Sequence, residues 1–197
     1  MTISPNHRPR LVVMLKEPRP GRVKTRLGRD MGMTAAAWWF RHQTAGLLRR
    51  LDDPRWQMIL AVAPDRSGMS SRVWPVHLPR IPQGGGDLGQ RMARIMHALP
   101  PGPVCIIGGD IPGITPAHIH LAFAELGRSP AVFGPAPDGG YWLVGLKRRR
   151  IPAGLFENVR WSSQYALTDT INSLGGQTHT LIDTLQDVDT VADLPRA

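Results

Sequence analysis

Hydrophobic positions along the chain form two kinds of segment that largely alternate. Short apolar runs of strand length occur at 11–15, 57–63, 104–107, 131–134, 141–146 and 178–182. Longer segments, at 34–51, 87–99, 115–126 and 163–174, repeat apolar residues with the period of an α-helix. Strands that alternate with helices predict an α/β domain around a mostly parallel sheet.

Two of the predicted helices carry clear start signals. From Leu88 onward, apolar residues recur every three or four positions, and Asp87 with Gln90 has the spacing of a capping box. Thr115 followed by Pro116 is a typical N-cap and first-turn pair. These signals predict that one helix begins after Asp87 and another after Thr115.

The composition favours one domain over residues 1–197. Hydrophobic residues make up 42% of the chain and charged residues 20%, which is typical of a globular protein. No apolar run approaches the ~20 residues that a bilayer requires, and the first residues lack the apolar stretch of a secretory signal. The single cysteine, Cys105, suits a reducing compartment. We therefore expect a cytoplasmic protein without a membrane partner.

The net charge of +9 is concentrated in the first 50 residues, which contain only two acidic side chains, Glu17 and Asp30. A basic patch of this kind predicts a polyanionic partner. Nucleic acid is disfavoured because the charge is confined to one segment and aromatic residues make up only 6%. We therefore expect nucleotide phosphates as the partner.

The charge is densest in the sequence KEPRPGRVKTRLG, residues 16–28, directly after the first apolar run. Arginine can fork onto phosphate oxygens, lysine supplies a compact charge, and glycine lets the backbone approach a ligand closely. A P-loop is disfavoured because Val23, not a glycine, immediately precedes Lys24-Thr25. A solvated surface loop is an equal alternative on these residues alone. The candidate phosphate-binding residues are Lys16, Pro20, Gly21, Arg22, Lys24, Thr25 and Arg26.

Two further segments carry candidate carboxylates. Asp110 follows the apolar run 104–107 and is a candidate ligand of Mg²⁺ or Mn²⁺; its alternative role is a turn or cap, although Thr115 is available to cap the next helix. Asp187 and Asp189 would point the same way in an extended chain and could complete the metal site. A cap for a helical turn over 190–193 is an equal alternative.

Two glycine-rich segments are candidates for ligand contacts. In GPAPDGGY, Asp138 is a candidate for orienting an acceptor or for contacting metal-bound phosphate, although Asp-Gly-Gly is also an ordinary hairpin signal. In PQGGGDLGQRM, backbone N–H groups at a helix start suit an anion or a base edge, whereas Asp87 also serves as a cap. The candidates in this second segment are Gln83, Gly84, Gly86, Asp87 and Arg91. Ligands of such sheets bind beyond the carboxyl ends of the strands, where we expect these segments to meet.

Six motifs in a fixed order resemble a family of small bacterial transferases of the GT-A type. They are K-x-P-x-P-G-R-V-K-T-R-L, Q-G-x-G-D-L-G-x-R-M, G-x-D-x-P-x-[LI], G-P-A-x-D-G-G-Y-x-L-[VI]-G-L, W-[SG]-[ST] and D-V-D-T-x-x-D-L. The resemblance runs from Lys16 to Leu194. Related folds include phospholactate guanylyltransferase and molybdenum-cofactor nucleotidyltransferases, and some members are assigned to arsenosugar biosynthesis as glycosyltransferases.

The resemblance implies a Rossmann-like three-layer α/β/α fold of the nucleotide-diphospho-sugar transferase type. It also implies that the first loop covers the nucleotide phosphates, that Asp110 binds the metal, and that Asp189 or Asp187 completes the site. Lys24, Arg26 and Asp138 are the catalytic candidates. The acceptor pocket is assigned to Gly139, Gly140, Tyr141 and Trp161. Gly109, Ile111, Gln90 and Ser163 depart from the residues usual in the family.

The expected function is a Mg²⁺- or Mn²⁺-dependent transfer of a glycosyl group from a nucleotide-diphospho-sugar to a small-molecule acceptor. One alternative is a nucleotidyltransferase of guanylyl or cytidylyl type with a small phosphorylated acceptor. A second is a non-catalytic nucleotide- or nucleic-acid-binding protein. A homodimer is left open.

Overall fold

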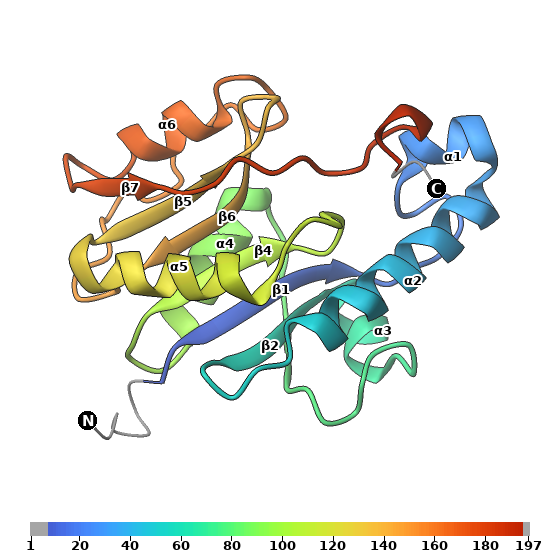
Figure 1. The fold of residues 1–197 in the computed structure, drawn as a ribbon, viewed down its shortest axis with the longest axis horizontal. Coiled ribbons are helices and arrows are strands. Elements are labelled where there is room, and N and C mark those ends of the chain that lie inside the picture. Colours follow the sequence, from blue (N-terminus) through green and yellow to red (C-terminus); the bar gives the residue numbers. More distant parts are fainter. Residues whose placement is uncertain (1–7, 195–197) are drawn as a thin grey trace.

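A seven-stranded sheet runs through the middle of the protein, and helices cover both of its faces (Figure 1). The computed structural model describes residues 8–194. The strands are β1 (Arg10–Lys16), β2 (Gln57–Ala63), β3 (Arg80–Pro82), β4 (Val104–Gly108), β5 (Ala131–Pro135), β6 (Tyr141–Leu146) and β7 (His179–Leu181). The helices are α1 (Thr25–Met31), α2 (Met33–Arg50), α3 (Asp65–Ser70), α4 (Leu88–Ala98), α5 (Pro116–Arg128), α6 (Ala166–Asn172) and the 3₁₀ turn η2 (Val191–Asp193).

The strand order is β3-β2-β1-β4-β6-β5-β7. Every neighbouring pair is parallel except the two that involve β6, which runs against both β4 and β5. The predicted mostly parallel, three-layer α/β/α architecture is therefore confirmed. No helix in the described part of the chain is both long and apolar enough to cross a bilayer.

Each face of the sheet contributes to a separate hydrophobic core. Leu11, Val13 and Leu15 of β1 point to the face covered by α2 and α5, whereas Val12 points to the face covered by α4 and α6. All four side chains are buried, as expected of a central parallel strand that is covered on both sides. This explains why the strands read as continuous apolar runs and do not alternate.

The structure contains three elements that the sequence patterns do not predict: α1, α3 and β3. All three are short, and β3 has only three residues, of which the last is Pro82. The helix predicted at 163–174 is also shorter, because the Ser163 hydroxyl accepts from the Tyr165 N–H and donates to the Arg160 carbonyl oxygen in a turn. The helix α6 therefore begins only at Ala166.

The sheet topology gathers the polar connections at one edge. The parallel strands β1, β4, β5 and β7 all end there, and the reversed strand β6 begins there. Residues 182–190, which we call the C-terminal strap, leave β7 and cross this edge to reach α1 (Figure 1). The first loop and the C-terminal strap thus lie side by side.

The C-terminal strap is attached to the rest of the fold at several points. The side chain of Val188 is buried against Leu27 of α1 and Ala36 of α2, and its N–H donates to the Asp110 carbonyl oxygen at 3.3 Å. Nearer to β7, the indole Nε1 of Trp142 donates to the Asp183 carbonyl oxygen at 2.9 Å. These contacts fix the strap across the edge of the sheet.

Replacing Trp142 with phenylalanine tests this attachment. Trp142→Phe removes the indole donor and leaves the Asp183 carbonyl without it, which we expect to lower the free energy of unfolding by about 1–3 kcal/mol. Hydrogen exchange in residues 182–190 should accelerate, as measured by mass spectrometry alongside urea unfolding.

Trp56→Phe is the matched control, because the buried Trp56 donates in the same way to the Leu51 carbonyl oxygen at 2.9 Å, away from the strap. It should cost similar stability and leave exchange in the strap unchanged. Equal exchange in the strap of both variants would show that Trp142 does not hold it.

Candidate functional site

Lys24 occupies a backbone position that is unusual for a lysine. It is the N-cap of α1 with φ 45° and ψ 49°, in the left-handed region, where a non-glycine residue costs on the order of 1–3 kcal/mol. Gly21 supplies a second left-handed turn three residues earlier, with φ 73°. The two turns aim the Lys24 side chain inward, and only 7% of it is exposed.

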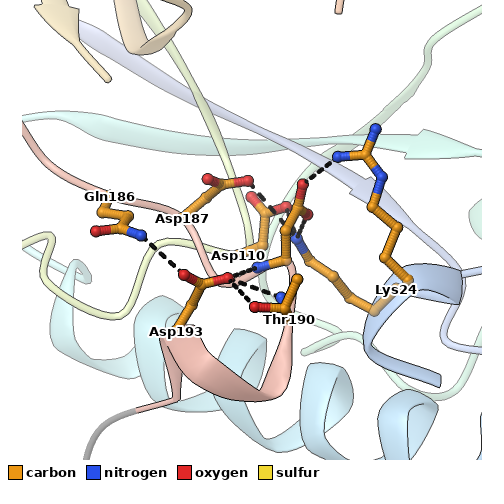
Figure 2. Close-up of polar contacts among 8 residues, drawn as sticks. Lys24, Asp110, Gln186, Asp187, Thr190 and Asp193 are labelled. Carbon is orange, nitrogen blue, oxygen red and sulfur yellow. Dashed lines mark hydrogen bonds and ion pairs between the residues drawn. The ribbon is translucent and has the colours of Figure 1, made fainter. Parts of the chain in front are cut away.

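Three carboxylates surround the Lys24 ammonium group (Figure 2). Its Nζ lies 2.6 Å from Oδ2 of Asp110, 2.9 Å from Oδ1 of Asp189 and 3.8 Å from Oδ2 of Asp187. We call Asp110, Asp187 and Asp189 the acidic cluster. The guanidinium of Arg26 approaches from the solvent side, with a distance of 2.9 Å to Oδ2 of Asp189. The structure thus unites the first loop, the end of β4 and the strap.

Local geometry explains how each carboxylate reaches this point. Asp110 follows two glycines at the end of β4, and a Cβ at Gly108 would lie 2.8 Å from Oδ1 of Asp110. In the strap, Val188 is buried while both neighbouring carboxylates reach Lys24, as expected for an extended segment.

Asp193 stabilises the turn that follows Asp189. Its carboxylate accepts from the N–H groups of Asp189 at 3.2 Å and Thr190 at 2.8 Å, and from the Thr190 hydroxyl at 2.8 Å (Figure 2). Thr190 and Asp193 form a capping box around η2. The two alternative interpretations of residues 187–193 are therefore compatible: the segment caps a helical turn and also presents two carboxylates.

The charges of the site shift one another's pKa values. Burial lowers the pKa of Lys24, but the ion pairs with Asp110 and Asp189 outweigh it, so that the pKa is raised. Burial and the charge of Asp189 raise the pKa of Asp187 to about 6. For Asp189, burial is outweighed by hydrogen bonds and charge from Lys24 and Arg26, and its pKa is lowered. The acidic cluster therefore holds more negative charge than one ammonium group compensates.

The acidic cluster offers only oxygen donors, which suit hard cations such as Mg²⁺ and Mn²⁺. Within residues 8–194, no three His, Cys, Asp or Glu side chains already form a metal site. The three carboxylates surround the Lys24 ammonium group, with N–O distances of 2.6–3.8 Å. The donor set fits a hard cation, provided that Lys24 leaves the cluster.

A cavity of about 290 Å³ adjoins the acidic cluster, and Asp110 and Asp187 belong to its lining. Gly140, Tyr141, Trp161 and Asp138 from the predicted acceptor and catalytic sets also line it. A larger depression of about 750 Å³, between the loop 150–158 and α6, contains none of the predicted site residues.

Gly139 is the one predicted acceptor residue that does not line the cavity. Its carbonyl oxygen accepts from the Leu167 N–H, and a Cβ there would lie 2.2 Å from the Gln164 carbonyl oxygen. Gly139 therefore packs against the chain before α6. The turn that contains it joins β5 to β6, so the hairpin reading of Asp-Gly-Gly is correct.

The second glycine-rich segment uses its polar groups internally. The amide of Gln83 is buried and donates to the carbonyl oxygens of β1 and β2, and the Gly84 N–H donates to Asp65 at 3.1 Å. Asp87 caps α4, and Arg91 donates to the Gly86 carbonyl oxygen at 2.9 Å. These bonds occupy groups that the sequence interpretation assigned to a nucleotide.

The other candidates of the first loop are exposed at the same edge of the sheet. Lys16 ends β1, Pro20, Gly21 and Arg22 lie in the loop, and Thr25 begins α1. Pro20, Gly21, Arg22 and Thr25 are within four residues of Lys24 along the chain, and all are solvent-exposed.

Sequence reasoning missed part of the cavity wall. Met14, Leu88 and Met92 line the cavity, and the apolar periodicity of 87–99 was the available signal for the last two.

The ion pair between Arg160 and Asp169 was also not predicted. It spans the turn that carries Trp161. Arg160 donates to Asp169 from Nε at 2.8 Å, from Nη2 at 2.9 Å and from its backbone N–H at 3.0 Å. These hydrogen bonds lower the pKa of Asp169 to about 2.

Comparison with protein families matches residues 47–163 to the family described as "Uncharacterized protein conserved in bacteria (DUF2064)". No curated protein matches the chain. Among solved structures, a protein of Desulfovibrio desulfuricans G20, whose proposed identity is a nucleotide-diphospho-sugar transferase, superposes with a TM-score of 0.80. It is 27% identical, and the match covers 94% of this chain and 84% of that one.

More distant structures share the fold. The 4-diphosphocytidyl-2C-methyl-D-erythritol synthase of Anaerococcus prevotii has a TM-score of 0.60 at 10% identity, covering 95% of each chain. Rv0371c of Mycobacterium tuberculosis, solved as a complex with manganese, has a TM-score of 0.54 at 17% identity, also covering 95% of each. The arsenosugar and guanylyltransferase relationships expected from the sequence do not appear among these findings.

Removing the ammonium group from the acidic cluster should destabilise the protein. In Lys24→Met the three carboxylates repel one another with only the exposed Arg26 left beside them. We expect a loss of about 1–3 kcal/mol, less than for a fully buried pair because the carboxylates are partly exposed. Urea unfolding in EDTA measures the loss, and Mn²⁺ should reverse it.

Arg26→Met is the control, since Arg26 contacts the same carboxylate from solvent with 68% of its side chain exposed. It should cost less than about 1 kcal/mol. If Lys24→Met matches this control in stability, or gains no more from Mn²⁺ than the wild type does, the acidic cluster is not a cation site.

The Arg160–Asp169 pair predicts a pH dependence. Because the pKa of Asp169 falls from 3.8 to about 2 on folding, its contribution is present above pH 4 and is lost as the pH falls toward 2. The melting temperature of Asp169→Asn should therefore lie below that of the wild type at pH 7 and converge with it near pH 2.

Asp53→Asn provides a matched control, since Arg55 lowers the pKa of Asp53 to about 2 in the same way at a distant site. Only Asp169→Asn should accelerate hydrogen exchange over residues 159–165. Unchanged exchange there would mean that the pair does not hold the turn with Trp161.

Proposed function

This chain belongs to the family of bacterial proteins described as DUF2064, and we propose that it is a metal-dependent transferase that uses an activated nucleotide. The observation that carries the proposal is the meeting of Lys24 with the acidic cluster at the mouth of a cavity, at the carboxyl edge of the sheet. Ligands of open α/β sheets bind at this edge.

The acidic cluster and the first loop have complementary roles in the proposal. Asp110, Asp189 and Asp187 would hold Mg²⁺ or Mn²⁺, which would supply positive charge to the diphosphate of the nucleotide. The ammonium of Lys24, which pairs with these carboxylates, is the nearest cation of the first loop to that position. Arg26 and Arg22, both exposed beside it, provide guanidinium groups for the same oxygens.

We propose glycosyl transfer as the reaction. The acceptor's hydroxyl oxygen forms a bond to the anomeric carbon of the sugar, and the bond from that carbon to the diphosphate oxygen breaks. The nucleoside diphosphate leaves with the electron pair, and Lys24 and Arg26 stabilise its growing negative charge. The proton of the hydroxyl passes to Asp138, whose carboxylate lies at the cavity.

One solved structure supports the preference for glycosyl transfer over nucleotidyl transfer. The Desulfovibrio protein, at 27% identity and a TM-score of 0.80, carries a proposed nucleotide-diphospho-sugar transferase identity. The cytidylyl-transferring synthase from Anaerococcus shares the fold at 10% identity, which supports the architecture and leaves the bond that breaks to experiment.

Thermal-shift titration tests nucleotide binding before the sugar is known. We expect a nucleoside diphosphate with Mn²⁺ to raise the melting temperature more than either alone, because ligands that bind the folded state stabilise it. Asp110→Asn should abolish the dependence on Mn²⁺. Asp183→Asn, a carboxylate of the strap outside the acidic cluster, should leave it intact.

Product analysis then identifies the reaction. Incubation with nucleotide-sugars should release a nucleoside diphosphate, whereas nucleotidyl transfer from a triphosphate would release pyrophosphate. Release of pyrophosphate would replace the glycosyl reaction with the nucleotidyl one. Absence of any metal-dependent nucleotide binding would refute both.

A further inference from the structure

The lining of the cavity carries charge of only one sign. Asp110, Asp138 and Asp187 contribute carboxylates, and among the described residues that line it there is no lysine, arginine or histidine. Lys24 does not belong to the cavity lining, and its ammonium group is paired with Asp110 and Asp189 of the acidic cluster. A second anion placed in the cavity would therefore find no basic side chain on the lining, and would compete with the carboxylates and the donor diphosphate for the metal ion and for Lys24.

The remaining wall is apolar and aromatic. Tyr141 and Trp161 meet edge to face with ring centroids 6.5 Å apart, and Met14 and Met92 lie on the same lining. The Tyr141 hydroxyl accepts from Thr170 at 3.3 Å, and burial raises its pKa, so that this ring presents a neutral surface. Such a wall favours a ligand with an apolar face.

Leu88 adds a feature that the fold does not require. It is the first residue of α4, faces the cavity, and is 46% exposed. Large apolar side chains left open beside a concave aromatic wall are typical of ligand contacts. Together with the cavity volume of about 290 Å³, this indicates a small ligand that covers Leu88 when it binds.

We propose that the acceptor is an uncharged, hydroxyl-bearing small molecule with an aromatic or alicyclic body, and that phosphorylated acceptors are excluded. This inference rests on the proposed function, because it assigns the cavity to the acceptor of that reaction. The apolar body lies against Tyr141, Trp161 and Leu88, and the hydroxyl group faces the carboxylates at the mouth. The basic side chains of the first loop bind the diphosphate of the donor and do not contact the acceptor.

The proposal makes a sharp prediction for two probes of nearly equal shape. 2-Phenylethanol should bind the wild-type protein in ligand-observed NMR titrations, and its phosphate monoester should bind at least tenfold more weakly, both in EDTA and in Mg²⁺. Leu88→Arg places a cation at the cavity and should reverse this preference. Leu121→Arg makes the same change at an exposed position on α5 and should leave it unaltered.

The outcomes separate this inference from the proposed function. If the phosphate ester binds as tightly as the alcohol, or if the alcohol does not bind, the acceptor class is wrong even when Mn²⁺-dependent nucleotide binding persists. If the alcohol binds with the predicted preference while nucleotides do not bind at all, the preference of the cavity for uncharged hydroxyl compounds stands, but the transferase proposal fails and the acceptor role fails with it. A Leu88→Arg protein that keeps the wild-type preference would also overturn the acceptor class.

Discussion

The attraction between one buried ammonium group and three carboxylates organises the functional edge of this protein. Lys24, Asp110 and the pair Asp187 and Asp189 come from three distant parts of the chain, and each would be costly at this position without the others. The left-handed backbone of Lys24 and the buried side chain of Val188 both serve this meeting. The strap crosses the sheet edge because its carboxylates and its apolar side chain have partners on opposite sides.

In this arrangement, the ammonium group of Lys24 occupies the space between the three carboxylates. Three carboxylates share one ammonium group in the acidic cluster, and burial together with the charge of Asp189 raises the pKa of Asp187. In the proposed function, a divalent cation would take the place of the ammonium among the carboxylates, and the lysine would be available to the anion that accompanies the metal. The proposal therefore predicts that binding of metal and of diphosphate is coupled through a single side chain.

Much of this could be predicted from the sequence, because the signals were local. The central strands are continuous apolar runs, Thr115 caps its helix, and alternation around Val188 places two carboxylates on one side of an extended segment. The shared edge of the sheet followed from parallel topology. Short elements such as β3 and α3 have too few residues for a periodic signal, and tertiary contacts stabilise them.

Contacts between distant residues account for what the sequence did not reveal. The amide of Gln83 serves the carbonyl groups of two strands, which no motif discloses. Gly109, where the related family usually has Thr or Ser, has its Cβ direction filled by Leu15, with 2.3 Å to Cδ2. The Lys24 ion pairs were not predicted either, because the sequence interpretation assigned Lys24 to the phosphates and the three aspartates to the metal. These contacts join Lys24 to residues as far as 165 positions away along the chain.

Anomalous diffraction from crystals grown with Mn²⁺ and a nucleoside diphosphate tests the central claim most directly. The account predicts a manganese peak bound by Asp110 and at least one carboxylate of the strap, with the ammonium group of Lys24 moved out of the acidic cluster onto the diphosphate. A manganese ion bound elsewhere, with Lys24 still enclosed by the three carboxylates, would contradict it.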